Sequence, residues 1–357
     1  MRSRSKSTLR EIAELTGVTR MAVSLALRGK VGVSKEKRKE IIHTAQRLGY
    51  QPDPEVAKLL ARIRASSTRK SHSNLALLTF GERPKAWKQF STERKYVEGA
   101  VARAKEHGYI LEEFWMNDPD MPRARLADIL WNRGIEGVVI APLLERLEQG
   151  KNRALDFDFS RFAAVEISET VNIPSLDRAM HDQYTSMQKC CQELALLGYK
   201  RIGLVLELSL DLRVNGKWSA AFLRHRQYAG GKRHAPPLLL SCPSQSDFDR
   251  WFDRYRPDVI VSVDGLGLKF LARRGLSIPD DVGYVSLDLD GETPQDFALG
   301  GIDQNSRIVG AAAIDQLISS IHGGRTGVPA QAVRMEIEGK WIPGESVRSA
   351  VPDTLHK

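Results

Sequence analysis

Two patterns of apolar positions divide this chain of 357 residues. In the first fifty residues apolar side chains recur at helical spacing, interrupted at Gly17. From residue 74 onward, short apolar runs of the kind found in buried strands alternate with helical stretches, and the alternation restarts near residue 184. The first pattern predicts a small all-helical domain. The second predicts an α/β core of two doubly wound parallel-sheet subdomains.

The alternation in the core predicts the individual elements. The first sheet is expected from strands 75–80, 108–111, 137–141 and 163–167, with helices 96–107 and 126–132. The second sheet is expected from strands 198–206, 259–263 and 282–287, with helices 184–197, 215–226 and 266–274. In open α/β sheets ligands bind beyond the carboxyl ends of the strands. Polar residues that follow these strands are therefore the candidates for a binding site.

The N-terminal helical pattern predicts a helix-turn-helix. Thr8, with Glu11 three residues later, has the spacing of a capping box. Gly17 allows a sharp turn, and Thr19 can cap a second helix, which would lie in the DNA major groove. A third helix, from Ser34 to Leu48, would close the core.

The charge distribution supports nucleic-acid binding by this end of the chain. The first 72 residues carry 17 Lys and Arg against 6 Asp and Glu, while the other 285 carry 36 against 38. A basic domain on a near-neutral body suits a protein of which one end meets phosphates. The alternatives are a helical hairpin that only packs, with solvated charges, and an anionic membrane. The membrane alternative lacks the amphipathic stripe that it would need.

Local motifs then resemble a family. Residues 33–38 read VSKEKR and residues 45–52 read AQRLGYQP, and with TGVT at 16–19 they closely resemble the LacI-type (LacI/GalR) bacterial transcriptional regulators. The resemblance covers nearly the whole chain. It implies a helix-turn-helix headpiece, a hinge helix and a periplasmic-binding-protein-like core that binds an effector.

The resemblance implies which residues contact double-stranded operator DNA. Arg20 and Met21 match base-reading positions, and Arg20 could donate bidentately to a guanine edge. Other positions match contacts to the backbone or to bases, and phosphate contacts position such a domain while base contacts specify the sequence. The candidate set is Thr8, Thr19, Arg20, Met21, Ser24, Leu25, Arg28, Ser34, Lys37, Tyr50, Leu59 and Leu60.

Two DNA-binding positions leave alternatives open. Leu25 stands where the family usually has arginine, so it could pack against a thymine methyl or simply within the headpiece. In the family a hinge-helix leucine wedges into a minor-groove step. Counting from Tyr50 indicates Leu59 as this wedge, and the local Ala-x-x-Leu match indicates Leu60. Both leucines could also only pack the paired hinge helices.

The resemblance and the strand-end rule together indicate an effector site. Arg213 matches an Arg-x-x-Gly motif whose guanidinium clamps a ligand hydroxyl or carboxylate. Asp264 and Asp288 follow strands and could accept sugar hydroxyls, although Asp264 could instead cap a helix. Glu166 is a further candidate, as an acidic residue of the cleft. Three aromatic residues could stack on a sugar ring or could simply belong to the hydrophobic core: Phe80, Trp87 and Trp218.

The effector itself cannot be carried over from the family. Val263 replaces the usual asparagine before Asp264, Leu289 replaces a second aspartate, and the loop 82–93 looks longer than usual. A carbohydrate or sugar derivative is the family's commonest effector and suits carboxylates with aromatic residues. Whether it induces or corepresses stays open.

An enzyme and an extracytoplasmic solute-binding protein are the competing classes. The three cysteines and eight histidines show no metal-ligand spacing, and no phosphate loop or nucleophile elbow occurs. We therefore expect no catalytic residues, no metal and no cofactor. A solute-binding protein would need a signal peptide, but the N-terminus has no hydrophobic stretch and carries the headpiece instead. No membrane-spanning apolar run occurs in the sequence. An odd number of cysteines without paired spacing suits a reducing cytoplasm. We therefore expect the protein in the cytoplasm, associated with the nucleoid.

The resemblance also implies domain boundaries and assembly. We expect a headpiece at 1–52, a hinge and linker at 53–73, a core at 74–345 and a tail at 346–357. Within the core, the N-subdomain would hold about 74–172 and 303–325, and the C-subdomain about 173–300 and 328–345. A homodimer is expected because two-fold symmetry matches operator half-sites. No leucine heptads follow residue 346 to build a tetramer.

Overall fold

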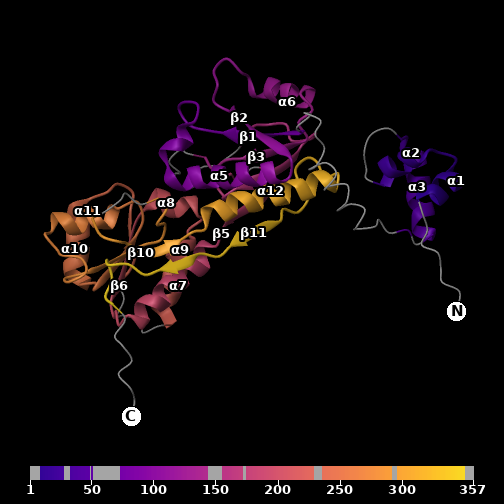
Figure 1. Ribbon diagram of the computed structural model, residues 1–357. Coiled ribbons are helices and arrows are strands. Elements are labelled where there is room, and N and C mark those ends of the chain that lie inside the picture. Colours follow the sequence, from indigo (N-terminus) through magenta and orange to yellow (C-terminus); the bar gives the residue numbers. More distant parts are fainter. Residues whose placement is uncertain are drawn as a thin grey trace, which may run out of the picture.

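The computed structural model describes three N-terminal helices and a two-lobed α/β core (Figure 1). The residues described are 9–27, 33–48, 50, 73–143, 155–171, 174–228, 235–291 and 296–349. The predicted fold class is confirmed. No helix among these residues is both long and apolar enough to span a membrane.

The N-terminal helices form a small core of their own. They are α1 (Leu9–Thr16), α2 (Arg20–Leu27) and α3 (Lys35–Arg47), and Gly17 between the first two has a φ of +63°. A positive φ is strained for residues with a side chain, so glycine suits this turn. The buried side chains are Ile12, Ala13, Val23, Ala26, Ile41 and Ala45. They lie at the helical spacing that the sequence predicts.

The first lobe has a six-stranded parallel sheet, ordered β11-β5-β4-β3-β1-β2. Helices α5 (Ser91–Glu106) and α12 (Ser306–His322) cover one face, and α6 (Arg123–Asn132) packs on the other. A short 3-10 turn, η1 (Ala86–Gln89), precedes α5. The strands are β1 (Ser73–Thr79), β2 (Tyr109–Trp115), β3 (Gly137–Ile140), β4 (Ala163–Ile167), β5 (Asp177–His181) and β11 (Arg334–Ile337).

The second lobe repeats this order as β12-β10-β9-β8-β6-β7, with only the β10–β12 pair antiparallel. The strands are β6 (Ile202–Glu207), β7 (Leu238–Leu240), β8 (Val259–Ser262), β9 (Gly283–Ser286), β10 (Gly300–Asp303) and β12 (Lys340–Ile342). Its helices are α7 (Gln183–Leu196), α8 (Leu208–Arg213), α9 (Lys217–Tyr228), α10 (Gln245–Tyr255) and α11 (Leu266–Arg273).

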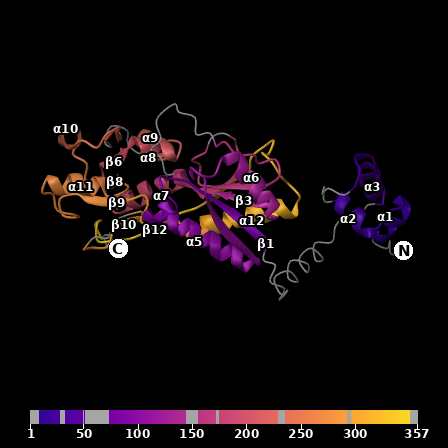
Figure 2. The ribbon, with the colours of Figure 1, turned by 90° about the horizontal axis from the view of Figure 1, so that it is seen from above.

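The chain crosses between the lobes three times: after β5, after β10 and between β11 and β12. Figure 2 shows the two lobes side by side, with α10 and α11 in one and α6 and β3 in the other. Hydrogen bonds join these crossings. The Asp182 amide donates to the Ile337 carbonyl over 2.9 Å, and the Asn305 side-chain amide donates to the Glu338 carbonyl over 2.8 Å. Crossings that are bonded to one another can act as a hinge between two otherwise separate sheets.

Two glycines let α5 and α12 approach closely, as the parallel ribbons of Figure 1 show. A Cβ at Gly99 would lie 2.0 Å from the Arg307 carbonyl oxygen, and one at Gly310 would lie 1.9 Å from the Tyr96 carbonyl oxygen. Any side chain there would push the backbones apart. This contact fixes the N-terminal turn of α5 at the interlobe crossing, and that turn lines a cavity between the lobes.

Several predicted boundaries are wrong. Strand β5 and strand β11 belong to the first sheet, so the predicted subdomain limits at 172/173 and 325/328 misplace them. The strand predicted from residue 198 begins at Ile202, because the amides of Lys200 and Arg201 bind the Asp258 carboxylate instead. The helix predicted from residue 96 begins at Ser91. Helices α8 and α10 were not predicted, and the loop 82–93 contains η1 and the start of α5.

Candidate functional site

The second N-terminal helix presents its first residue to solvent. Thr19 precedes α2, and its hydroxyl accepts a hydrogen bond from the Ala22 amide over 3.2 Å. This is the cap that the sequence predicts. Arg20 is the first residue of the helix and is exposed. The exposed guanidinium is therefore accessible for the base contact that the sequence predicts.

The third helix carries two of the predicted phosphate contacts near its start. The Ser34 hydroxyl accepts a hydrogen bond from the Lys37 amide over 3.2 Å, and it retains a proton that it can donate to a phosphate. The Lys37 ammonium pairs with Glu40 over 2.8 Å. Tyr50 packs against the small helical core.

Other predicted DNA contacts lie wholly or partly outside the described residues. Thr8, Arg28, Leu59 and Leu60 are outside them. Met21, Ser24 and Leu25 lie on α2, but their side chains are not described. The choice between Leu59 and Leu60 as the wedge, and the role of Leu25, therefore stay predictions.

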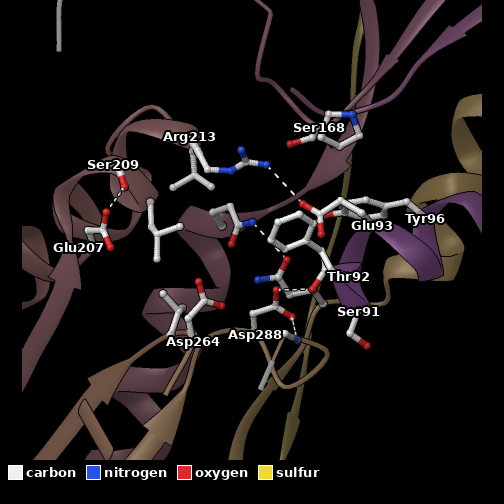
Figure 3. A pocket seen from close by; sticks show the side chains of 18 of the residues that line it. Ser91, Thr92, Glu93, Tyr96, Ser168, Glu207, Ser209, Arg213, Asp264 and Asp288 are labelled. Carbon is white, nitrogen blue, oxygen red and sulfur yellow. Dashed lines mark hydrogen bonds and ion pairs between the residues drawn. The ribbon is translucent and has the colours of Figure 1, made fainter. Parts of the chain in front are cut away.

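A cavity of about 610 Å³ lies between the lobes (Figure 3). Most of its lining comes from the start of α5, from α8 and from residues that follow strands, as expected for an open α/β sheet. Its lining residues are Gln89, Phe90, Ser91, Thr92, Glu93, Arg94, Tyr96, Pro142, Ser168, Gln183, Glu207, Ser209, Leu210, Arg213, Val214, Trp218, Val263, Asp264, Asp288, Gly291 and Gln304.

Arg213 crosses the cavity from the second lobe to the first. It ends α8, and its Nη1 donates to the Leu143 carbonyl over 2.6 Å. Its Nη2 lies 3.4 Å from Glu93 Oε1, and its side chain is only 19% exposed. The alternative of an exposed arginine at a helix start is therefore wrong. Figure 3 shows the guanidinium pointing toward Glu93.

Asp288 follows β9 and reaches the first lobe. Thr92 Oγ1 donates to its Oδ2 over 2.7 Å, while the amides of Asp290 and Gly291 donate to its Oδ1 over 3.1 and 3.2 Å. Burial, helped by the carboxylates of Asp290 and Glu93 and opposed by the Thr92 hydrogen bond, raises the pKa of Asp288 to about 7. Burial also raises the pKa of Glu93, which Arg213 opposes.

Asp264 follows β8 with a φ of +54°, in the left-handed region. The next helix, α11, is preceded by Gly265 without a side-chain cap, so the alternative of helix capping by Asp264 is wrong. The carboxylate keeps access to solvent in the cleft, yet protein surrounds most of it. This burial raises its pKa, opposed by Arg213 and reinforced by Glu207.

Trp218 is the predicted aromatic residue that borders the cavity, at the start of α9. It is 6% exposed, and its indole Nε1 has no hydrogen-bond partner in the described structure. Gln183 borders the cavity as well and is 7% exposed. Its Nε2 donates to Gln304 Oε1 over 3.3 Å, whereas its own Oε1 is unpartnered among the described residues.

Three predicted effector residues are not brought to the described cavity. Phe80 directly follows β1, and its side chain is buried in the core under α6. Trp87, on η1, packs against the core under α5 and donates from Nε1 to Glu113 over 2.8 Å. Glu166 points into the first lobe, where it accepts from the Val171 amide over 2.7 Å and lies 3.5 Å from Arg178. Burial raises the pKa of Glu166 to about 7.

The start of α5 belongs to this site, although the sequence pattern did not indicate it. Thr92, Glu93 and Tyr96 lie there (Figure 3), and Glu207 ends β6 with its carboxylate accepting from the Ser209 hydroxyl over 2.7 Å. The strand-end rule could have indicated Glu207. No group of three or more His, Cys, Asp or Glu side chains among residues 9–349, where these are described, could hold a metal ion.

Comparison with known proteins agrees with both parts of this description. The family model for bacterial regulatory proteins of the lacI family matches residues 8–53. No curated protein sequence is recognisably similar to the chain.

The solved structures that share the fold include the following three. The transcriptional regulator CelR in complex with cellobiose has a TM-score of 0.53 at 17% identity, over 96% of this chain and 100% of that one. The Lac repressor dimer bound to operator and the anti-inducer ONPF has a TM-score of 0.53 at 16% identity, over 97% and 100%. A lacI-family transcriptional regulator from Rhizobium etli has a TM-score of 0.57 at 16% identity, over 77% and 99%.

At these identities the structural likeness establishes the fold, and the match at residues 8–53 establishes the kind of DNA-binding domain that this fold carries. Residues 8–53 thus form a DNA-binding domain of the kind found in bacterial regulatory proteins of the lacI family, and the chain shares the fold of the Lac repressor.

Proposed function

We propose that this regulator is a homodimeric repressor whose affinity for a palindromic operator is set by a sugar or sugar derivative bound between the lobes. The carrying observation is that the cavity takes its polar groups from both lobes: Thr92 and Glu93 from the first, Arg213, Asp264 and Asp288 from the second. A ligand held by both lobes has a different affinity for each of their relative positions. Differential affinity is what couples a ligand to a conformational equilibrium.

The coupling would run through the three crossings to the N-terminal helices. A change in lobe position moves the first lobe, from which β1 leads back toward the DNA-binding domain. In a dimer this changes the spacing of the two recognition helices, and operator half-sites tolerate only one spacing. A coupling of this kind usually amounts to about 1–3 kcal/mol, or roughly 5- to 150-fold in operator affinity.

Two of the structures with this fold support the ligands proposed for the cavity and for the N-terminal helices. One is of a regulator complexed with cellobiose, and the other is of a repressor dimer bound to operator. The carboxylates and the arginine of the cavity match groups that bind hydroxyls through charge-assisted hydrogen bonds.

Operator binding in the presence of carbohydrates tests the proposal. A palindromic duplex recovered by selection from random sequences would be titrated with the full chain, by fluorescence anisotropy, with and without a panel of mono- and disaccharides and their derivatives. The proposal expects one class of sugar to change operator affinity at least fivefold. Arg213→Ala should abolish that change, whereas Arg274→Ala, whose guanidinium pairs with Asp249 and Asp253 on the surface of the second lobe, should keep it.

Two results would overturn it. One is an effector response that survives in both Arg213→Ala and Asp288→Ala. The other is specific operator binding by a chain that lacks residues 1–72.

A further inference from the structure

The cavity between the lobes holds more negative than positive side chains. Its lining includes four carboxylates, from Glu93, Glu207, Asp264 and Asp288, but only two guanidinium groups, from Arg94 and Arg213. Three of the carboxylates belong to the second lobe and follow or end its strands. The imbalance is therefore built into the strand ends.

Both guanidinium groups are already engaged. Arg213 donates to the Leu143 carbonyl and pairs with Glu93, and Arg94 Nη1 donates to the Lys88 carbonyl over 2.8 Å. Asp264 and Asp288 form no ion pair within 4 Å with any residue that the structure describes. Two carboxylates of the cleft thus face it without a cationic partner in contact.

These two carboxylates border one small space. A Cβ built on Gly291 would lie 3.3 Å from Asp264 Oδ1 and 3.1 Å from Asp288 Oδ2. Gly291 leaves this volume open, and any larger residue would fill it. An ammonium group has three donors and binds carboxylate oxygens at about 2.8 Å, so its size and valence suit a space bordered by two such oxygens.

Two buried polar groups indicate that a polar ligand occupies the rest of the cleft. The Trp218 indole N–H and the Gln183 carbonyl oxygen border the cavity, and neither has a hydrogen-bond partner in the described structure. Both residues are more than nine-tenths buried. Unpartnered buried polar groups are costly, and a ligand with an acceptor and a donor would satisfy both.

A neutral ligand would leave the charge imbalance unrelieved. Its hydroxyls could replace the water around Asp264 and Asp288 as hydrogen-bond donors, but they would supply no opposite charge, and a buried charge without a pairing charge is costly. A cationic ligand offsets that cost. The raised pKa values of Asp264 and Asp288 agree, because each carboxylate already resists ionisation in the unliganded cleft.

We propose that the effector carries a protonated amine, which lies between Asp264 and Asp288 while its hydroxyl-bearing body meets Trp218 and Gln183. The effector class is an amino sugar or an amino polyol. This inference rests on the proposed function, since it assigns the chemistry of the same site.

Matched pairs of compounds test the charge directly. Calorimetric titration of the full chain at pH 7 would compare 1-amino-1-deoxysorbitol with sorbitol, glucosamine with glucose and galactosamine with galactose. We expect at least one amine to bind at least tenfold more tightly than its neutral partner. Asp264→Asn should weaken that amine at least tenfold, whereas Asp253→Asn, on the exposed face of α10, should leave it unchanged. A neutral compound that binds as tightly as its amine, or no binding by any of the amines, overturns the proposal.

The pH dependence of amine binding gives a second measurement. Asp288 is surrounded by Thr92, Glu93 and Tyr96 from the first lobe and by Asp264, Asp290 and Arg213 from the second. Because the pKa of Asp288 is about 7, its carboxylate is mostly protonated at pH 5.5 and gains charge toward pH 7. Amine affinity should rise several-fold over that interval, and Asp288→Asn should flatten the rise. Binding that does not change with pH in the native chain contradicts the proposal.

The unliganded protein provides a test that needs no ligand. Removing one of two like charges without a cationic partner should stabilise the empty cleft, so Asp264→Asn should melt about 2–4 °C higher at pH 8. A lower melting temperature would show that Asp264 is satisfied within the protein, and would overturn the proposal. If an amine binds but never changes operator affinity, only the proposed function fails. If a neutral sugar changes operator affinity and Arg213→Ala abolishes that change, only the proposal of an amine effector fails.

Discussion

The DNA-binding helices and the interlobe cleft are built in opposite ways. The first use one stretch of chain, residues 9–48, and each helix of the three packs on the other two through side chains close in sequence. The cleft draws on segments scattered from Gln89 to Gln304. A short contiguous domain is specified by local signals such as caps, a turn glycine and apolar spacing. A cleft between lobes exists only once distant strands have been placed side by side.

The two regions also differ in the sign of their charge. The first 72 residues carry a large excess of Lys and Arg, which suits a polyanion. The cleft has an excess of carboxylates. The difference shows that one chain has separated its two binding tasks by electrostatics as well as by position.

The largest expected effect comes from breaking the helical core alone. Ile12→Asp places a charge at a position with no exposed surface, in a domain of three short helices. Burying an unpaired carboxylate costs several kcal/mol, more than so small a core can supply. We expect operator affinity to fall more than about 100-fold in anisotropy titrations, toward the non-specific level. The melting transition of the two-lobed core should stay within 2 °C, and a large shift of it would contradict the separation of the regions.

Breaking the cleft should leave the DNA-binding region intact. Arg213→Ala removes a charged hydrogen bond to Leu143 and the pairing with Glu93, across the lobes. In the proposed complex the Arg213 guanidinium also donates to the effector. A hydrogen bond to a charged group contributes about 1.5–3 kcal/mol, so effector affinity should fall roughly 10- to 150-fold in calorimetry. Circular dichroism and non-specific DNA binding should match the native chain. Loss of non-specific binding would show that the two regions depend on one another.

The pH dependence of the free energy of unfolding should test the hinge separately from the DNA-binding helices and the cleft. His181, at the end of β5, is 2% exposed, and burial lowers its pKa to about 4 against the opposing charge of Asp182. The unfolded chain has a histidine pKa of about 6.5, so it takes up this proton first as the pH falls. His181 therefore stabilises the fold above pH 6.5, and this contribution is lost as the pH falls toward 4.

His181→Gln should remove that loss. Between pH 6.5 and 4.5 the variant should lose about 1–2 kcal/mol less of its free energy of unfolding than the native chain, measured by urea denaturation. Glu166 and Asp288 act with the opposite sign, since their raised pKa values make the folded chain bind more protons below pH 7. They are present in both chains, so they cancel in the comparison. Identical slopes for the two chains would exclude His181 as the titrating group.

The smallest effect tests a single local signal. Thr19→Ala removes the hydroxyl that accepts from the Ala22 amide at the start of α2. The loss of such a cap costs about 1 kcal/mol. Operator affinity should fall severalfold, and Thr19→Ser should restore it. If Thr19→Ser fails as Thr19→Ala does, Thr19 acts through its methyl group or through DNA rather than as a cap.

The site was only partly predictable, and the residues show why. Arg213, Asp264 and Asp288 were predicted because they follow strands or lie in a family motif, whereas Trp218 was predicted only as an aromatic residue that could stack on a sugar ring. Phe80 and Glu166 were misplaced, because a residue near or just beyond the end of a buried strand can turn into the core beside the sheet instead of toward the cleft, and an apolar run does not reveal which. Thr92 and Glu93 were missed, since a helix start becomes part of a site only when another lobe closes over it.

The sequence by itself determined the helix-turn-helix, the basic charge of that end and the two successive α/β patterns, because these depend on neighbours within a few residues of one another. Only the tertiary structure decided that β5 and β11 join the first sheet, that Gly99 and Gly310 bring α5 against α12, and that Asp264 and Asp288 border one space. Such facts depend on contacts between residues far apart in the chain, and local spacing carries no record of them.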